Sequence, residues 1–277
     1  MEGIITAIKR NAIADGDGLR TTVFFKGCPL KCIWCHNPEG ISPAPQVAKF
    51  GHLCMGCGQC QGACTPETAE CCPADALVAY GQKTTVAQLL PKLLQDKAFY
   101  DNSGGGVTLS GGECLMQPEF AEALAQALTE QGVRVNVDTC GFVSRSALER
   151  LIPFTDTFLF DLKAVDPEVH KACTGQDNGI ILENLAYLCS RGCKVEIRYP
   201  LVMGYNDKEC EKIGEFLQNR PGITRVKVLQ YHDLAASRYE ALGMENTLPK
   251  TITTAEDVVY ACQKLRTYGL QAISGNE

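Results

Sequence analysis

Cysteine is the residue type in this 277-residue sequence with the most capacity for chemistry. Nine of the sixteen cysteines lie between Cys28 and Cys72, whereas the whole chain has four histidines. Thiolates are soft ligands, so this composition favours iron–sulfur clusters over sites built from imidazole. Residues 1–18 contain no pattern of a secretory signal, and we therefore expect a cytoplasmic protein, in which disulfides are rare. The cysteines predict metal or redox chemistry.

Three cysteines, Cys28, Cys32 and Cys35, form the first group, within GCPLKCIWCHNPEG and with C-x3-C-x2-C spacing. They follow a predicted strand directly, which places them in a strand–helix loop. Three thiolates can hold three irons of a [4Fe–4S] cluster and leave the fourth iron without a protein ligand, as in a catalytic metal site. From the spacing alone, a zinc-binding loop or a loop of ordinary reduced cysteines is also open.

The second group has C-x2-C-x2-C spacing and consists of Cys54, Cys57 and Cys60. Cys64 completes the spacing of bacterial ferredoxins, but the proline that follows the last ferredoxin cysteine stands here after Cys72. We therefore predict one auxiliary [4Fe–4S] cluster, held by Cys54, Cys57, Cys60 and Cys72. Cys64 is the rival fourth ligand and Cys71 the third choice, and a zinc-bound module is the alternative.

Short runs rich in β-branched and aromatic residues alternate with longer stretches of helical periodicity. The predicted strands are 21–26, 106–109, 133–138, 157–162, 194–199 and 225–230. Helices are expected at 84–98 and 119–130, and further helix starts at Ser144 and near Asn206. Six strand–helix units predict a parallel sheet, and six are fewer than the eight of a closed barrel. The expected fold is α/β, a partial (β/α)6 TIM-like barrel.

Residues 41–80 interrupt this alternation. They open with the turn-forming SPAP, carry six cysteines and are too short for an apolar core of their own, so a metal centre would have to hold them together. We predict a barrel made of residues 1–40 and 81–277, and a small cysteine-rich ferredoxin-like insert at 41–80.

Composition excludes several functions. With 26 basic and 32 acidic side chains the net charge is −6, which argues against a nucleic-acid binder. No apolar run approaches the roughly 20 residues of a membrane span, so no membrane partner is expected. No coiled-coil or extended apolar surface pattern is visible, and a monomer is expected.

The first cysteine loop and seven other blocks together resemble a known family. The blocks are DGDGLRT (15–21), GGVTLSGGE (105–113), VDTCG (137–141), FDLKAVDPEVHKACTG (160–175), ILENL (181–185), RYPLVMGYND (198–207) and YHDLAASRYEALG (231–243). In this order they resemble radical S-adenosylmethionine (SAM) enzymes, in the branch of glycyl-radical enzyme activating enzymes. The short insert differs both from relatives with two ferredoxin-like clusters and from those with none.

The resemblance implies an activity. In that family SAM binds the open iron, an electron from the reduced cluster cleaves SAM, and the resulting 5′-deoxyadenosyl radical takes a hydrogen atom from a backbone glycine of a partner enzyme. The implied cofactors are two [4Fe–4S] clusters and SAM. The implied partners are a glycyl-radical enzyme and a flavodoxin or ferredoxin-type reductant.

The resemblance also implies roles for individual residues. Catalysis falls to Cys28, Cys32, Cys35 and Lys163, with Lys163 and Arg198 suited to the SAM carboxylate and Glu113 to its ammonium group. The full set of implied SAM contacts is Trp34, His36, Asn37, Gly111, Gly112, Glu113, Asp138, Asp161, Lys163, Arg198 and His232. For the charged residues, an ion-pair network inside the barrel is an alternative that does not exclude SAM binding.

Residues ahead of the first predicted strand are implied to grip the partner's glycyl loop: Asp15, Gly16, Gly18 and Arg20. A plain turn is the alternative. Cys114 and Cys140 are interpreted as small packing residues that face the barrel mouth. Two other functions stay open, namely a radical SAM enzyme acting on another peptide or small molecule, and a ferredoxin-like electron carrier.

Overall fold

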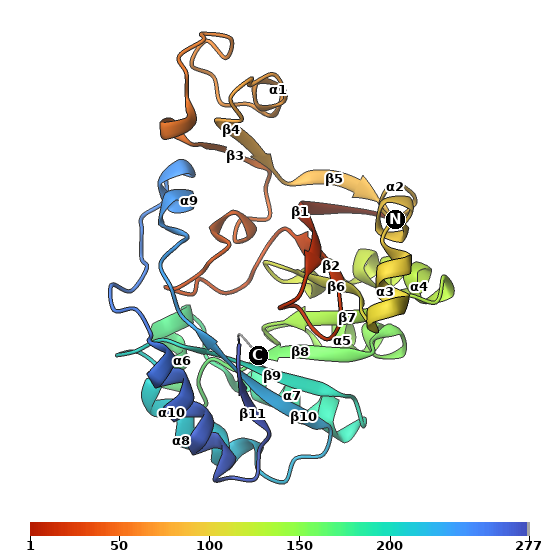
Figure 1. The fold of residues 1–277 in the computed structure, drawn as a ribbon, viewed down its shortest axis with the longest axis vertical. Coiled ribbons are helices and arrows are strands. Elements are labelled where there is room, and N and C mark those ends of the chain that lie inside the picture. The colour runs from red at the N-terminus through yellow and green to blue at the C-terminus, as the bar shows by residue number, and fades with distance from the viewer. Residues whose placement is uncertain (276–277) are drawn as a thin grey trace.

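A nine-stranded sheet forms the body of the chain, in the order β11-β10-β9-β8-β7-β6-β2-β1-β5 (Figure 1). This computed structural model describes residues 1–275. The strands of the sheet are β1 (Glu2–Ala12), β2 (Arg20–Phe25), β5 (Gln82–Thr85), β6 (Gly106–Gly111), β7 (Arg134–Thr139), β8 (Thr157–Asp161), β9 (Val195–Leu201), β10 (Ile223–Gln230) and β11 (Ala272–Ser274).

The six strands predicted from the sequence are β2 and β6 to β10, and they lie side by side and parallel. The predicted α/β partial barrel is therefore confirmed. Three strands of this sheet were not predicted: β1 and β5 add an antiparallel edge beside β2, and β11 extends the parallel edge beyond β10. The sheet curves around its interior without closing, since β5 and β11 are its two edges.

Most helices of the barrel cover the outer face of the sheet, and the short helix that follows β10 lies beside the insert (Figure 1). The helices are α2 (Val86–Leu94), α3 (Lys97–Ser103), α4 (Pro118–Glu130), α5 (Arg145–Leu151), α6 (Pro167–Thr174), α7 (Gly179–Ser190), α8 (Cys210–Leu217), α9 (Ala236–Ala241) and α10 (Ala255–Arg266). Single turns of 3₁₀ helix occur at η1 (Pro38–Gly40), η3 (Cys114–Met116), η4 (Ile152–Phe154) and η5 (Asp207–Glu209). The expected helix at 119–130 is α4, and Ser144 caps α5 as predicted.

The helix expected at 84–98 is instead two helices, α2 and α3. Between them, the carboxylate of Asp96 accepts hydrogen bonds from Arg10 at 2.7 Å and from Thr21 at 3.0 Å. These bonds fix Asp96 on β1 and β2, and the chain changes direction there. The helix that was expected near Asn206 begins as η5 and continues as α8.

Side chains on the parallel strands alternate between the two faces of the sheet. Toward the helices they are apolar, as with Val107, Val137 and Phe158 in the main core. The residues between them face the barrel interior and are polar, as with Thr108 and Asn136. The sheet therefore has an apolar exterior under the helices and a polar interior.

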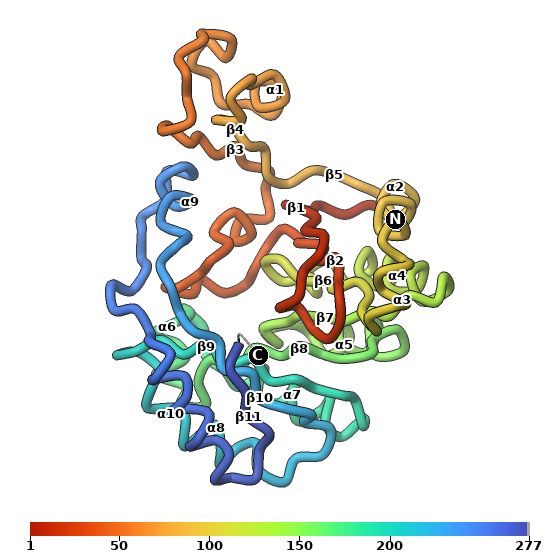
Figure 2. The backbone as a smooth tube through the Cα atoms, viewed as in Figure 1, coloured from red at the N-terminus to blue at the C-terminus, as the bar shows by residue number. Residues whose placement is uncertain are grey.

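The insert at 41–80 projects from the barrel (Figure 2). The chain leaves on β3 (Gln46–Lys49) and returns on β4 (Leu77–Tyr80), which pair antiparallel, and α9 lies against β3. The chain between the two strands contains η2 (Gly51–Leu53) and α1 (Pro66–Glu70), and most of its side chains are exposed. The insert thus has little apolar core, and a metal centre that holds it together stays a prediction.

Within residues 1–275, no helix is both long and apolar enough to cross a membrane.

Candidate active site

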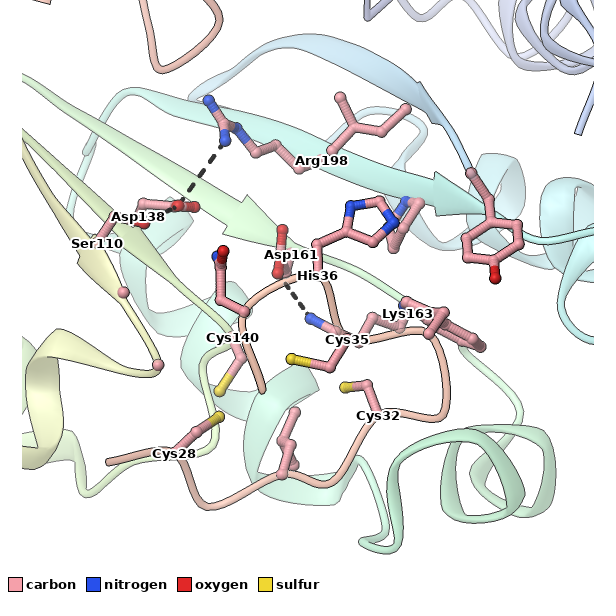
Figure 3. A pocket seen from close by; sticks show the side chains of 18 of the residues that line it. Cys28, Cys32, Cys35, His36, Ser110, Asp138, Cys140, Asp161, Lys163 and Arg198 are labelled. Atoms are coloured by element: carbon pink, nitrogen blue, oxygen red, sulfur yellow. Dashed lines mark hydrogen bonds and ion pairs between the residues drawn. The ribbon is translucent and has the colours of Figure 1, made fainter. Parts of the chain in front are cut away.

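A cavity of about 690 Å³ lies inside the barrel, where the parallel strands end. Its wall includes the ends of β6, β7, β8, β9 and β10 and the loop that follows β2. In parallel α/β proteins this edge carries the chemistry. Cys28, Cys32 and Cys35 all line the cavity, and their side chains face it in Figure 3.

Backbone bonds hold the cysteine loop from both sides. The N–H groups of Lys31 and Ile33 donate to carbonyls at the end of α6, at 2.9 and 3.0 Å. From the far end of the chain, the Tyr239 hydroxyl donates to the Cys35 carbonyl at 3.1 Å. The loop is therefore fixed through its backbone, and its three thiols face the cavity.

The three thiols suit a cluster better than a single ion. No group of three or more His, Cys, Asp or Glu side chains within residues 1–275 is arranged to hold one metal ion. A [4Fe–4S] cluster binds each thiolate on a different iron, so its ligands stand further apart than those of a mononuclear site. Separate thiols that share one cavity match that requirement.

Burial affects how readily these thiols ionise. It raises the pKa of Cys35 to about 12 and raises the pKa of Cys32 further. For Cys28, a hydrogen bond from Cys140 lowers the pKa instead. Metal binding would therefore have to displace protons from Cys32 and Cys35.

Charged and polar side chains from four strand ends converge on the same cavity (Figure 3). The Lys163 ammonium donates to Asp161 Oδ2 at 2.7 Å, and the Ser110 hydroxyl donates to Asp138 Oδ2 at 2.5 Å. The Arg198 guanidinium lies 3.7 Å from both Asp138 and Asp15. These residues lie far apart in the sequence, and the barrel brings them together as expected. They also form the ion-pair network that was the alternative interpretation.

The charges of this network depend on burial. Burial raises the pKa of Asp138 to about 7, although the positive charge of Arg198 opposes the shift. For Lys163, burial lowers the pKa, but the Asp161 carboxylate together with Cys32 and Cys140 more than offsets it, so the pKa lies above its usual value. The cavity therefore keeps a positive charge beside the cysteine loop.

Ten of the eleven implied SAM contacts line the cavity: Trp34, His36, Asn37, Gly111, Gly112, Asp138, Asp161, Lys163, Arg198 and His232. The two glycines are required by the fold, because a Cβ on Gly111 would come within 2.2 Å of the Phe25 nitrogen and one on Gly112 within 2.4 Å of the Gly27 oxygen. The imidazoles of His36 and His232 stack, with ring centroids 4.1 Å apart. Together with Tyr231 they form an aromatic wall.

Glu113 is the exception among the implied SAM contacts. Its side chain is almost fully buried and does not line the cavity. The carboxylate accepts the N–H of Leu115 at 3.0 Å, the N–H of Cys140 at 2.7 Å and the Thr139 hydroxyl at 2.9 Å. These bonds join the start of η3 to the end of β7, and a contact of Glu113 with the SAM ammonium stays a prediction.

The DGDGLR segment lies largely inside the barrel. Arg20 is 2% exposed and donates to the Thr108 hydroxyl at 2.8 Å and the Val107 carbonyl at 2.9 Å. Gly16 has a φ of +114° and lies against Asn136. Asp15 reaches the cavity wall, and Gly18 is half-buried. Arg20 and Gly16 therefore have structural contacts inside the barrel, and a contact with a partner stays a prediction for all four residues.

The cysteines of the insert lie outside this cavity. Cys54, Cys57 and Cys64 are exposed, and Cys60 and Cys72 are half-buried. Hydrogen bonds from the backbone N–H groups of Ala74 and Leu77 lower the pKa of Cys72, which favours its thiolate. The choice of the fourth auxiliary ligand stays a prediction.

Several cavity residues were not predicted as functional. Cys140 lies two residues after the predicted Asp138, and Ser110 precedes the predicted Gly111 at the end of β6. Leu234 and Ile252 form an apolar part of the wall. Position close to a predicted residue could have indicated Cys140 and Ser110. Nothing in the sequence pattern indicated Ile252, because only the fold brings it to the cavity.

Comparisons with known proteins agree with this geometry. Residues 22–217 match the Radical SAM superfamily. The choline trimethylamine-lyase activating enzyme of Oleidesulfovibrio alaskensis is 37% identical over 273 residues, which cover 88% of each chain. The benzylsuccinate synthase activating enzyme of Thauera aromatica is 34% identical over 98% of this chain and 92% of its own.

A solved structure leads to the same family. A domain of the pyruvate-formate lyase-activating enzyme from Bacteroides vulgatus superposes with a TM-score of 0.52 and 28% identity, covering 61% of this chain and 98% of that domain. The chain therefore belongs to the radical SAM superfamily and, within it, to the glycyl-radical enzyme activating enzymes.

Proposed function

We propose that this chain installs a glycyl radical on a separate enzyme, with SAM bound at a [4Fe–4S] cluster on Cys28, Cys32 and Cys35. The observation that carries the proposal is the meeting of these three thiols with Asp138, Lys163 and Arg198 in one cavity. When bound, the cluster and SAM together supply the 5′-deoxyadenosyl radical that removes a hydrogen atom from a glycine.

The chain's own residues bind and orient SAM. Arg198 and Lys163 suit its carboxylate, because both are buried cations that line the cavity. Asp138 and Asp161 suit its positively charged groups. The stacked imidazoles of His36 and His232 and the neighbouring Trp34 suit the flat adenine ring.

The partner's glycine must reach this cavity in an extended segment. Leu234 lines the cavity yet is 78% exposed, and Ile252 lines it at 41% exposure. An exposed apolar rim is typical of a surface that receives another chain. The relatives are named for activating different enzymes, such as choline trimethylamine-lyase and benzylsuccinate synthase, so the similarity supports the class of partner without naming one.

The insert is proposed to hold a second [4Fe–4S] cluster on Cys54, Cys57, Cys60 and Cys72. Two observations support this: the cysteines lie on a part of the chain with little apolar core, and the pKa of Cys72 is lowered. The division into barrel and insert, a flavodoxin or ferredoxin-type reductant, a monomeric state and a cytoplasmic location stay predictions.

The test is anaerobic activation of a candidate partner. The reduced protein and SAM are incubated with the glycyl-radical enzyme encoded beside its gene, and the mixture is examined by EPR. We expect the doublet of a glycyl radical on the partner together with release of 5′-deoxyadenosine. Release of 5′-deoxyadenosine with no radical on any glycyl-radical enzyme would point to a different radical SAM substrate.

A further inference from the structure

Cys140 is a fourth thiol in the cavity. It follows β7, is 6% exposed and lines the cavity together with Cys28, Cys32 and Cys35. Figure 3 shows its sulfur beside that of Cys28, and the two side chains are hydrogen-bonded. The sequence indicated only packing for this residue, and the geometry indicates more.

The turn that carries Cys140 is held rigidly. Glu113 Oε2 accepts the N–H of Cys140 at 2.7 Å and the Thr139 hydroxyl at 2.9 Å. On the other side, the Asn184 amide donates to the Gly141 carbonyl at 2.9 Å. A buried carboxylate and a buried amide thus position one small turn, and the direction of the Cys140 thiol follows from that anchoring.

A thiol beside a metal-bound thiolate acts as a hydrogen-bond donor to it. In a [4Fe–4S] centre, hydrogen bonds to the sulfur atoms offset the negative charge that the cluster gains on reduction. Such donors around the ligands shift the reduction potential upward, and the groups that orient them contribute to the same effect. Cys140 has the geometry for this role toward Cys28, because the two side chains are hydrogen-bonded.

We propose that Cys140 donates an S–H···S hydrogen bond to the Cys28 sulfur when Cys28 binds iron, and that this bond makes the cluster easier to reduce. Glu113 is then a positioning residue that acts through Cys140. The inference rests on the proposed function, because it requires a cluster on the loop of Cys28.

The experiment is an EPR-monitored redox titration of the full-length protein with its clusters in place. The signal of the loop cluster is the one that a Cys32→Ala variant lacks, which separates it from the auxiliary cluster. In Cys140→Ala we expect the ratio of reduced to oxidised loop cluster at a fixed potential to fall about tenfold, a midpoint about 59 mV more negative. Cys140→Ser retains a donor, so its midpoint should lie between those of Cys140→Ala and the unaltered protein.

Controls separate this role from packing. Cys189→Ala removes a buried thiol from α7, outside the cavity, and should leave the midpoint unchanged. An unchanged midpoint in Cys140→Ala would overturn the proposal, and so would complete loss of the loop cluster, since that would make Cys140 a ligand. If the unaltered protein has no signal that depends on Cys32, the proposed function itself fails.

Discussion

Lys163 donates to Asp161 at 2.7 Å, from a buried ammonium at the end of β8 to a carboxylate on the cavity wall. The two residues lie directly beside the cysteine loop, and both line the cavity. Lys163 and Asp161 therefore form an internal ion pair of the barrel, and the ammonium of Lys163 places a positive charge beside the thiols. The structure shows the ion-pair interpretation of the charged strand ends for this pair, and its contact with SAM stays a prediction.

Replacing Lys163 tests whether this ion pair contributes to SAM binding and to stability. Lys163→Met should weaken SAM binding tenfold or more, an effect of about 1.4 kcal/mol or greater, because the SAM carboxylate loses a buried cation. The free energy of unfolding should fall by roughly 1–3 kcal/mol, since Asp161 keeps partial access to water. Equilibrium binding of SAM and denaturant unfolding measure the two effects.

Lys212→Met is the matched control, because Lys212 forms its ion pairs at the surface, with Asp166 and Glu209. It should leave SAM binding unchanged. Unaltered SAM affinity in Lys163→Met would remove Lys163 from the site.

Replacing Arg20 shows whether its side chain stabilises the fold or binds the partner. Arg20→Gln should lower the free energy of unfolding by about 2–4 kcal/mol, because it leaves Thr108 and the Val107 carbonyl without their buried donor. Denaturant unfolding measures the loss. Arg134→Gln, at an exposed neighbour with one 3.3 Å bond to Gly104, should change it by no more than about 0.5 kcal/mol. If Arg20→Gln kept full stability and lost only partner activation, Arg20 would be a partner contact after all.

Iron analysis tests the auxiliary ligands. The anaerobically purified protein should hold about eight irons, four per cluster. Cys72→Ser should lower this to about four, whereas Cys64→Ser should leave it at about eight. The reverse result would make Cys64 the fourth ligand, and an unaltered protein with zinc in place of the insert's iron would exclude the second cluster.

The elevated pKa of Asp138 predicts a specific pH dependence. In an unfolded chain an aspartate has a pKa of about 3.9, whereas burial raises that of Asp138 to about 7. The folded state therefore binds this proton more tightly, and the resulting stabilisation is full below the unfolded pKa and is lost as the pH rises through about 7. Asp138→Asn, which cannot ionise, should lose less stability than the unaltered protein between about pH 5 and pH 8.

Unfolding by denaturant at these two pH values measures the difference. Asp101→Asn, at an exposed residue of α3, should behave like the unaltered protein. An equal pH dependence in Asp138→Asn would show that Asp138 is ionised throughout this range.

The parallel strands could be predicted because each is a short apolar run followed by a helical pattern. β1 could not, since most of its side chains are exposed or half-buried and it pairs antiparallel at the edge. The break between α2 and α3 also could not be predicted from the sequence, because it depends on a contact between Asp96 and the distant Arg10. Local patterns thus identify the repeating units, and tertiary contacts decide the edges and the breaks.

The candidate site shows the same limit. The residues of the cavity could be located because strand ends in a parallel barrel share one edge. The direction in which a single side chain points could not be predicted from the sequence. Glu113 stands where the sequence suggested, but its carboxylate bonds to the turn after β7, and that turn aims Cys140 at Cys28.

The most direct test of the central claim is the response of the loop cluster to SAM. The reduced protein is examined by EPR with and without SAM, and with Cys32→Ala as the reference that lacks this cluster. An iron without a protein ligand binds SAM directly, so we expect the Cys32-dependent signal to shift when SAM is added. A Cys32-dependent signal that SAM leaves unchanged would contradict the account.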